Sequence, residues 1–317
     1  VLIGPKGIVG KHRKSHSYIA EPKWSAPGQE HLVYDTKIGK IAILICMDIH
    51  FIETARLVAL QDADIIIHIS NWLSERTPGP YWISRAFENS AYLIEGNRWG
   101  LERTVQFSGG SCIINPDGSI ASVIDSGDGI CYAEIDIDWA RKREVLGQKV
   151  FNDRRPEMYM NLPTDPYLWN PMDFFGLYGL NPLPEGKKTK ITVAQINSTN
   201  EIDDNLNKII DFSVNVKKEG SELVVFPELA LTGHLNNSKN AQTIESPVIK
   251  KLIDFSNMNN LYICFGFAEK KGKEFFNSSM LIGPEGILGV YRKIHLNNND
   301  RKWASEGNEW KYFDTKI

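Results

Sequence analysis

The chain has 317 residues, of which 42% are apolar and 24% are charged. This composition is close to that of average globular proteins, so it excludes a disordered, collagen-like or disulfide-scaffold chain. The formal net charge is −3 without a long run of one sign, so we expect neither a nucleic-acid partner nor a membrane-surface patch. No stretch reaches the roughly 18 apolar residues of a membrane span, and four scattered cysteines without a CxxC pair predict reduced thiols in a cytoplasmic protein.

Short β-branched runs alternate with helical patterns along the chain, which predicts an α/β fold. Several of these runs are apolar on both faces, which indicates strands covered by other layers. The predicted strands are Ile41–Cys46, Asp64–Ile69, Tyr92–Gly96, Ser111–Asn115, Ile130–Ile135, Ile191–Ile196, Leu223–Pro227, Tyr262–Phe267 and Ser279–Gly283. The predicted helices are Ile52–Gln61, Tyr81–Asn89, Asn205–Lys218 and Val248–Asn257.

The chain contains an internal repeat. Leu2–Ile38 and Leu281–Ile317 align without a gap at an offset of 279 residues, and 18 of the 37 paired positions are identical. A period of this length measures a whole domain rather than a solenoid unit. We interpret the chain as a fragment of a tandem two-domain protein that begins inside one copy and stops inside the next. A circularly permuted single domain with a duplicated end is the alternative.

Residues 161–189 break the alternation of strands and helices. They contain five prolines and no clear period, and their last residues are basic. These features predict a tail and linker between the two copies.

Cys46 is the candidate nucleophile. It ends the apolar run ILIC and precedes a helical pattern, and a cysteine at such a turn is exposed beside a helix N-terminus that favours its thiolate. The alternative is an inert buried cysteine.

Two lysines and a glutamate are candidates for the groups that assist it. Lys14 and Lys293 lie at equivalent positions of the repeat, each within Arg-Lys-x-His, and Glu228 closes the apolar run LVVFPE. Open α/β sheets place reactive groups at the carboxyl ends of their strands. The alternatives are solvated lysines and a capping or ion-paired glutamate.

Together these residues resemble the nitrilase superfamily, the carbon–nitrogen hydrolases with a Glu-Lys-Cys triad. The matching motifs are VVFPELALTG around Glu228, YRKIHL around Lys293, HRKSH around Lys14 and ICMD around Cys46. The resemblance covers nearly the whole chain outside residues 161–189. It leaves the first copy with Lys14 and Cys46 but no triad glutamate, and the second with Glu228 and Lys293 but no triad cysteine.

The resemblance implies an α/β fold of the nitrilase type, a four-layer α-β-β-α sandwich. Here it would be made of the C-terminal part of one copy (residues 1–160) and the N-terminal part of a second (residues 190–317), joined by the linker. It also implies a second carboxylate seven residues after the lysine. Glu21 fills this position in the first copy and the shorter Asp300 in the second.

The expected function is hydrolysis of a non-peptide C–N bond, an amide or an N-carbamoyl group. A carboxylate takes the proton of Cys46, the thiolate attacks the carbonyl, and the lysine with the backbone N–H of Met47 stabilises the oxyanion. Ammonia leaves, and water hydrolyses the thioester. This chemistry needs no metal and no organic cofactor.

Three alternatives stay open at this stage. One copy serves as a non-catalytic partner domain, or the substrate is a nitrile, although Cys-Met-Asp is more like the amidases and carbamoylases of the family. We expect a small-molecule amide, carbamoyl or nitrile substrate and a homo-oligomer formed through the sandwich faces. The third alternative is that the two part-domains dock on each other and bring Cys46, Glu228 and one lysine together.

Overall fold

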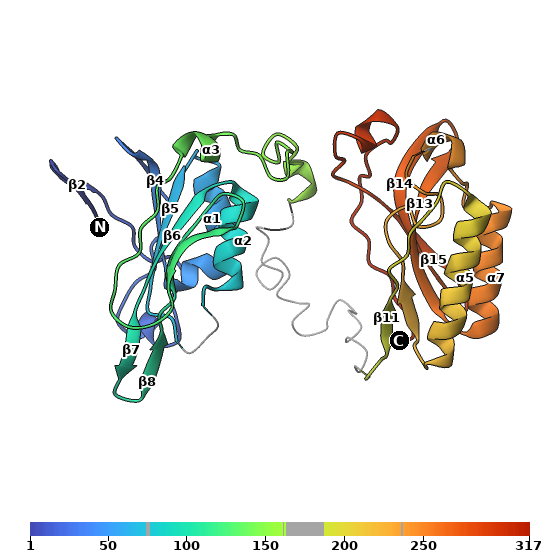
Figure 1. Ribbon diagram of the computed structural model, residues 1–317, viewed down its shortest axis with the longest axis horizontal. Coiled ribbons are helices and arrows are strands. Elements are labelled where there is room, and N and C mark those ends of the chain that lie inside the picture. Colours follow the sequence, from blue (N-terminus) through green and yellow to red (C-terminus); the bar gives the residue numbers. More distant parts are fainter. Residues whose placement is uncertain (74–76, 161, 163–186, 236) are drawn as a thin grey trace, which may run out of the picture. The chain divides into compact units, whose positions relative to one another are not determined.

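The computed structural model describes residues 1–73, 77–160, 162, 187–235 and 237–317. It divides into two compact units, Val1–Asp153 and Arg154–Ile317, each of which is described by itself (Figure 1). Most of the predicted linker, residues 161–189, lies outside the described residues. The domain boundaries therefore stay predictions.

The first unit is built on a mixed sheet. Among the described residues it has six strands in the order β10-β9-β6-β5-β4-β3. The central strands β4 (Gly39–Ile45), β5 (Ile65–Ser70) and β6 (Tyr92–Asn97) are parallel. Their carboxyl ends therefore meet at one edge, which positions Cys46 beside the ends of β5 and β6. Antiparallel strands flank them: β3 (Val33–Thr36) on one side, β9 (Ser111–Ile114) and β10 (Ile120–Ile124) on the other.

Helices cover both faces of this sheet to different extents. The larger buried cluster joins Leu44 and Ile66 to α1 (Ile52–Ala59) and α2 (Pro80–Asn89). On the other face of the sheet, Ile41 and Ile65 pack with the short helix α3 (Ile137–Arg141). Two small hairpins complete the unit, β1 (Leu2–Gly4) with β2 (Gly7–Gly10) and β7 (Trp99–Glu102) with β8 (Val105–Ser108).

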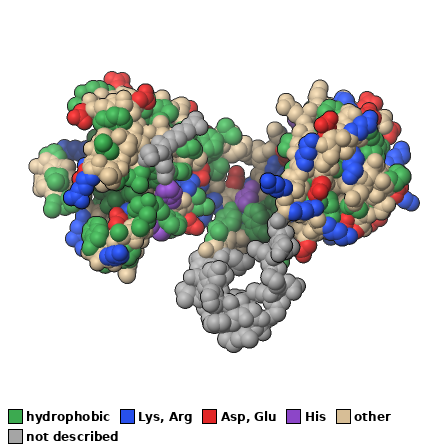
Figure 2. Space-filling model, turned by 90° about the horizontal axis from the view of Figure 1, so that it is seen from below, with side chains coloured by type: hydrophobic (Ala, Val, Ile, Leu, Met, Phe, Trp, Pro, Cys, Tyr) green, Lys and Arg blue, Asp and Glu red, His purple; other side chains and the backbone are tan. Residues whose placement is uncertain are grey.

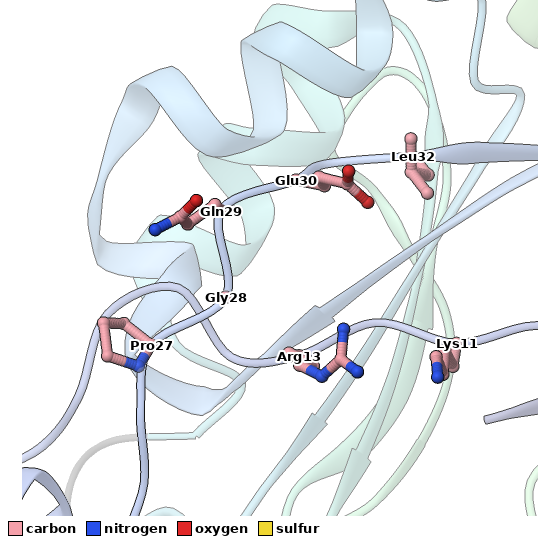
Figure 3. Close-up of a pocket in the computed structure, with 7 residues that line it drawn as sticks. All are labelled: Lys11, Arg13, Pro27, Gly28, Gln29, Glu30 and Leu32. Carbon is pink, nitrogen blue, oxygen red and sulfur yellow. The ribbon is translucent and has the colours of Figure 1, made fainter.

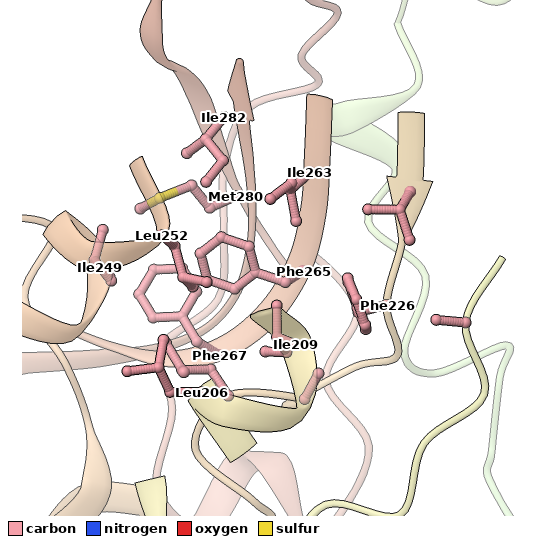
Figure 4. Close-up of a cluster of buried hydrophobic side chains, with 14 of the residues drawn as sticks. Leu206, Ile209, Phe226, Ile249, Leu252, Ile263, Phe265, Phe267, Met280 and Ile282 are labelled. Carbon is pink, nitrogen blue, oxygen red and sulfur yellow. The ribbon is translucent and has the colours of Figure 1, made fainter. Parts of the chain in front are cut away.

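The second unit has a mixed sheet of its own, with the order β11-β12-β13-β14-β15 over the described residues. The parallel strands are β11 (Ile191–Val193), β12 (Leu223–Val225) and β13 (Tyr262–Lys271), followed by the antiparallel β14 (Glu274–Gly283) and β15 (Gly286–Arg292). The helices α5 (Ile202–Lys218) and α7 (Pro247–Asn259) lie side by side on one face of the sheet (Figure 1), and α6 (Asn237–Asn240) is a single turn. Phe265, Phe267 and Met280 of the sheet interdigitate with Ile209 and Leu252 of these helices (Figure 4).

The predicted α/β class is confirmed, because each of the two units has a mixed sheet packed against helices. One predicted strand is wrong: Ile130–Ile135 forms no sheet ladder. Its alternating pattern is real, since Cys131 and Ile135 are half-buried while Tyr132 is exposed. However, β10 occupies the edge beside β9, and the sequence analysis did not predict β10.

The sequence repeat is also a repeat of local structure. The Gly28 amide donates to the Lys14 carbonyl at 2.7 Å, and the equivalent Gly307 amide donates to the Lys293 carbonyl at 2.9 Å. A Cβ on either glycine would lie 2.2 Å from a backbone oxygen, that of Arg13 or Arg292. A short 3-10 helix lies between the lysine and the glycine of each loop, Glu21–Lys23 in the first and Asp300–Lys302 in the second. The two lysines therefore lie in equivalent loops.

The surface carries charges of both signs. On the face of the second unit that Figure 2 shows, Lys and Arg side chains are interspersed with Asp and Glu. None of the helices in the described part of the chain combines the length and the apolar character that crossing a bilayer requires.

Candidate active site

Cys46 lies where β4 ends and a 3-10 helix, Cys46–His50, begins. Its φ angle is +47°, a left-handed backbone conformation that residues other than glycine rarely adopt. Such strained backbone is concentrated at functional sites. The strand-to-helix turn is where the sequence analysis expected it, but the cysteine is half-buried at the carboxyl edge of the parallel strands rather than exposed.

Two adjoining hollows share Cys46. A cavity of about 310 Å³ is lined by Lys14, Glu21, Cys46, Ser70 and Asn71, among others. A second, of about 220 Å³, has aromatic walls that include Trp72 and Phe107. The sulfur therefore faces charged groups on one side and apolar groups on the other.

Lys14 and Glu21 form an ion pair at the first of these hollows. The Lys14 ammonium lies 2.6 Å from Glu21 Oε2, and the backbone N–H of Tyr18 donates to the same oxygen. Burial by itself raises the pKa of Glu21, but the hydrogen bonds from Lys14 and Tyr18 outweigh it and the pKa lies below its ordinary value. Glu21 is thus held as a carboxylate beside the lysine.

Opposing effects act on the pKa of the Cys46 thiol. Burial raises it, whereas the Lys14 ammonium and hydrogen bonds from the backbone N–H groups of Asn71 and Met47 lower it, and burial prevails. The thiol therefore keeps its proton in this surrounding, so a base must remove it before the sulfur can attack. The Lys14 ammonium and the N–H groups of Asn71 and Met47, which would stabilise the thiolate, are already in place.

Asp48 joins the lysine loop to the cysteine turn. It is fully buried, and its Oδ1 accepts from Ser15 N at 3.0 Å, Ser15 Oγ at 2.8 Å and His16 N at 2.9 Å. Its Oδ2 accepts from His12 Nε2 at 2.9 Å and Ile45 N at 3.1 Å. Burial raises the pKa of Asp48, but these bonds together hold it well below the usual range. The sequence analysis did not assign this role.

The second unit holds the other predicted residues. Lys293 Nζ lies 2.8 Å from Glu228 Oε1 and 2.6 Å from Asp300 Oδ2. Burial raises the pKa of Glu228, but hydrogen bonds from Lys293 and Asn277 outweigh it, so the pKa is lowered. Burial lowers the pKa of Lys293, but its bonds to Asp300 and Glu228 prevail and raise it. Asp300 thus reaches its lysine at the same distance as Glu21 reaches Lys14, although its side chain is one methylene shorter.

Two residues that the sequence analysis missed support Glu228. The Asn277 amide donates to Glu228 Oε1 at 2.7 Å. Gly266 lets the turn after β12 lie close to β13, because a Cβ there would be 2.4 Å from Leu229 N. Gly266 N also donates to Pro227 O at 3.1 Å.

A further hollow of the first unit lies beside the lysine loop but does not include Cys46. It has about 270 Å³ and is lined by Lys11, Arg13 and Gly28, among others, and Figure 3 shows Arg13 and Gly28 on two neighbouring segments. Within the described parts of the chain, no group of three or more His, Cys, Asp or Glu side chains is placed to hold a metal ion.

Each set of site residues lies within one unit. The first unit brings Lys14, Glu21, Cys46 and Met47 together, and the second brings Glu228 and Lys293 together with Asp300. The thiol and one carboxylate thus lie beside Lys14 in the first unit, and two carboxylates lie beside Lys293 in the second.

The chain belongs to the carbon–nitrogen hydrolase family, which its residues 1–143 and 190–317 match. It is similar to a nitrilase of Pyrococcus abyssi, with 35% identity over 162 residues, 50% of this chain and 62% of that protein. It is also similar to the deaminated glutathione amidase of Homo sapiens, with 29% identity over 178 residues, 51% of this chain and 54% of that protein. These matches thus span little more than half the length of the relatives.

Among solved structures, an amidase from Nesterenkonia sp. matches 47% of this chain and 54% of its own, with 25% identity and a TM-score of 0.40.

Proposed function

We propose that this protein hydrolyses an amide or N-carbamoyl group through a thioester on Cys46, with release of ammonia. The observation that carries the proposal is that the two lysine loops are copies of each other. The first shows a thiol and a carboxylate around Lys14, and the second shows two carboxylates around Lys293. Because the loops are copies, we infer that the complete site has a glutamate equivalent to Glu228 as the base, a carboxylate in the position of Glu21, and the Cys46 thiol.

The raised pKa of Cys46 supports a general base. Glu228 or its equivalent takes the thiol proton as the sulfur attacks the carbonyl carbon. The proton then passes to the leaving nitrogen, so R–CO–NH2 gives R–CO–S–Cys and NH3. Water, deprotonated by the same carboxylate, then splits the thioester into R–COOH and the free thiol. The lysine ammonium and the Met47 N–H stabilise the oxyanion of both steps.

The second copy supplies a lysine with two carboxylates but no triad cysteine. Its second carboxylate, Asp300, is one methylene shorter than Glu21, but its 2.6 Å contact with Lys293 matches that of Glu21 with Lys14. The shorter acid therefore gives no reason to exclude the second copy from catalysis.

The test is ammonia release from a panel of carboxamides, N-carbamoyl compounds and nitriles. We expect release from amides or carbamoyl compounds by the wild-type protein, and its loss in Cys46→Ala, with Cys131→Ala as the matched control. Release from nitriles alone would favour the nitrilase alternative. Undiminished release by Cys46→Ala would refute the assignment of Cys46.

A further inference from the structure

Two buried polar residues that this mechanism does not use lie directly behind the nucleophile. His68 of β5 and Glu95 of β6 are direct neighbours across the two parallel strands, and their side chains are 0% exposed. His68 Nδ1 contacts Glu95 Oε2, and Ser70 Oγ donates to Glu95 Oε1. A buried ionisable pair is costly, and strands of this kind are normally filled by aliphatic side chains.

The other nitrogen of His68 reaches the nucleophile. His68 Nε2 lies 3.0 Å from the backbone carbonyl oxygen of Cys46. Because a carbonyl oxygen only accepts, Nε2 carries the hydrogen of this bond. The contact between Nδ1 and Glu95 Oε2 shares a second hydrogen and holds the other side of the ring. Trp72 and Trp82 pack edge-on against the ring, with centroids 6.0 and 6.1 Å away. The imidazole is therefore held in one orientation.

The carbonyl of Cys46 and the N–H of Met47 belong to one peptide group. A trans peptide is planar, so its C=O and N–H point in opposite directions. A hydrogen bond that fixes the carbonyl on His68 therefore turns the Met47 N–H toward the other side, where it reaches the Cys46 sulfur. Since Cys46 is in the strained left-handed region, this peptide needs such an external anchor.

We propose that His68 and Glu95 are positioning residues, which aim the backbone N–H of Met47 at the oxyanion formed when Cys46 attacks a carbonyl. The inference rests on the proposed function, because it assigns the pair to the acylation step. Loss of one oxyanion donor typically costs about 100- to 1,000-fold in rate. A donor that is misdirected rather than removed loses part of this factor, and we expect a loss of at least about tenfold.

The test compares two reagents on the same sulfur. Iodoacetamide alkylates Cys46 by displacement at a saturated carbon and forms no oxyanion. p-Nitrophenyl acetate acylates it through an oxyanion, giving acetyl-Cys46 and p-nitrophenolate. Both rates are read on the Cys46 peptide by mass spectrometry, and their ratio isolates stabilisation of the oxyanion from thiol exposure.

In His68→Met, which keeps the volume but has no donor, we expect the ratio of acylation to alkylation to fall at least about tenfold. His68→Gln, whose amide N–H takes the place of Nε2–H, should recover most of the ratio. Ile66→Val changes a core residue of the same strand that does not hold the Cys46 carbonyl, and it should leave the ratio unchanged.

An unchanged ratio in His68→Met, or two rates that fall in parallel, would overturn the positioning role and leave the proposed function intact. A wild-type chain whose Cys46 is alkylated but never acylated would overturn the proposed function and this inference with it.

Discussion

Asp48 anchors the lysine loop to the cysteine turn, and Asp48→Asn tests this directly. The side chain keeps its shape, but one of its two oxygens becomes an NH2 group. At the Oδ1 position this group would face three donors, from Ser15 and His16. At the Oδ2 position it would face His12, which can adjust its tautomer, and the Ile45 N–H, which cannot. The second orientation is therefore preferred, and the Ile45 N–H loses its acceptor.

The cost follows from these contacts. A buried donor left without a partner costs about 1–3 kcal/mol, and the remaining bonds lose the charge that makes them about twice as strong. We expect the loop to be destabilised by about 2–5 kcal/mol. Because each 1.4 kcal/mol corresponds to tenfold, the Ser15, His16 and Ile45 amides should exchange with deuterium at least roughly 30-fold faster. Asp35→Asn, an exposed aspartate of β3, is the matched control and should stay within about 0.5 kcal/mol of wild type.

The pH dependence has a definite sign. The folded-state pKa of Asp48 is lowered from 3.8, so its contribution to stability is complete at neutral pH and is lost as pH falls below about 4. The Asp48→Asn chain should lack this part of the acid transition. Exchange rates within threefold of wild type at pH 7, or an unchanged acid transition, would refute the anchoring role.

The remaining predictions concern the charges and one glycine. In Lys14→Met the pKa of the Cys46 thiol should rise further because a nearby cation is lost. The pH midpoint of iodoacetamide alkylation should therefore move upward, whereas Lys37→Met, at an exposed lysine, should leave it in place. Equal midpoints in the two variants would contradict the placement of Lys14 beside Cys46. In Lys293→Met the pKa of Glu228 should rise toward its ordinary value, which a carbon-13 titration of the carboxyl group measures, and a lower or unchanged pKa would show that the ion pair is not formed. Gly266→Ala should lower the free energy of unfolding by about 1–3 kcal/mol because the new methyl group meets Leu229 N. Gly129→Ala, whose Cβ meets nothing closer than 3.5 Å, should not lower it. Equal urea midpoints for the two variants would count against a close turn at Glu228.

The strands and helices that the sequence predicted are those with strong periodic patterns. The run ILIC and the helical pattern after it gave β4, the turn at Cys46 and α1 almost at their observed bounds. The prediction for Ile130–Ile135 failed because alternation shows which side chains face inward but does not provide a neighbouring strand. Only the pairing of β9 with β10 decides which segment occupies that edge.

The candidate residues themselves were predictable from motifs, but their supports were not. Asp48 holds Ser15 and His16, which are more than 30 residues away in the chain. Asn277 lies two strands from the end of β12, so its contact with Glu228 depends on the register of the sheet. The pair of His68 and Glu95 left a signal, a histidine in the run IIIHIS and a glutamate in the run YLIEGN. Their partnership follows only once β5 and β6 are known to be neighbours.

The most direct test of the account is to trap the acyl group on the enzyme. The protein is incubated with a carboxamide that it hydrolyses, quenched in acid and digested, and its cysteine peptides are weighed. The account predicts the acyl mass on the Cys46 peptide, its release by hydroxylamine, and its absence after Cys46→Ala. Turnover of the amide with the acyl group on another residue, or with full activity in Cys46→Ala, would contradict the central claim that Cys46 is the nucleophile.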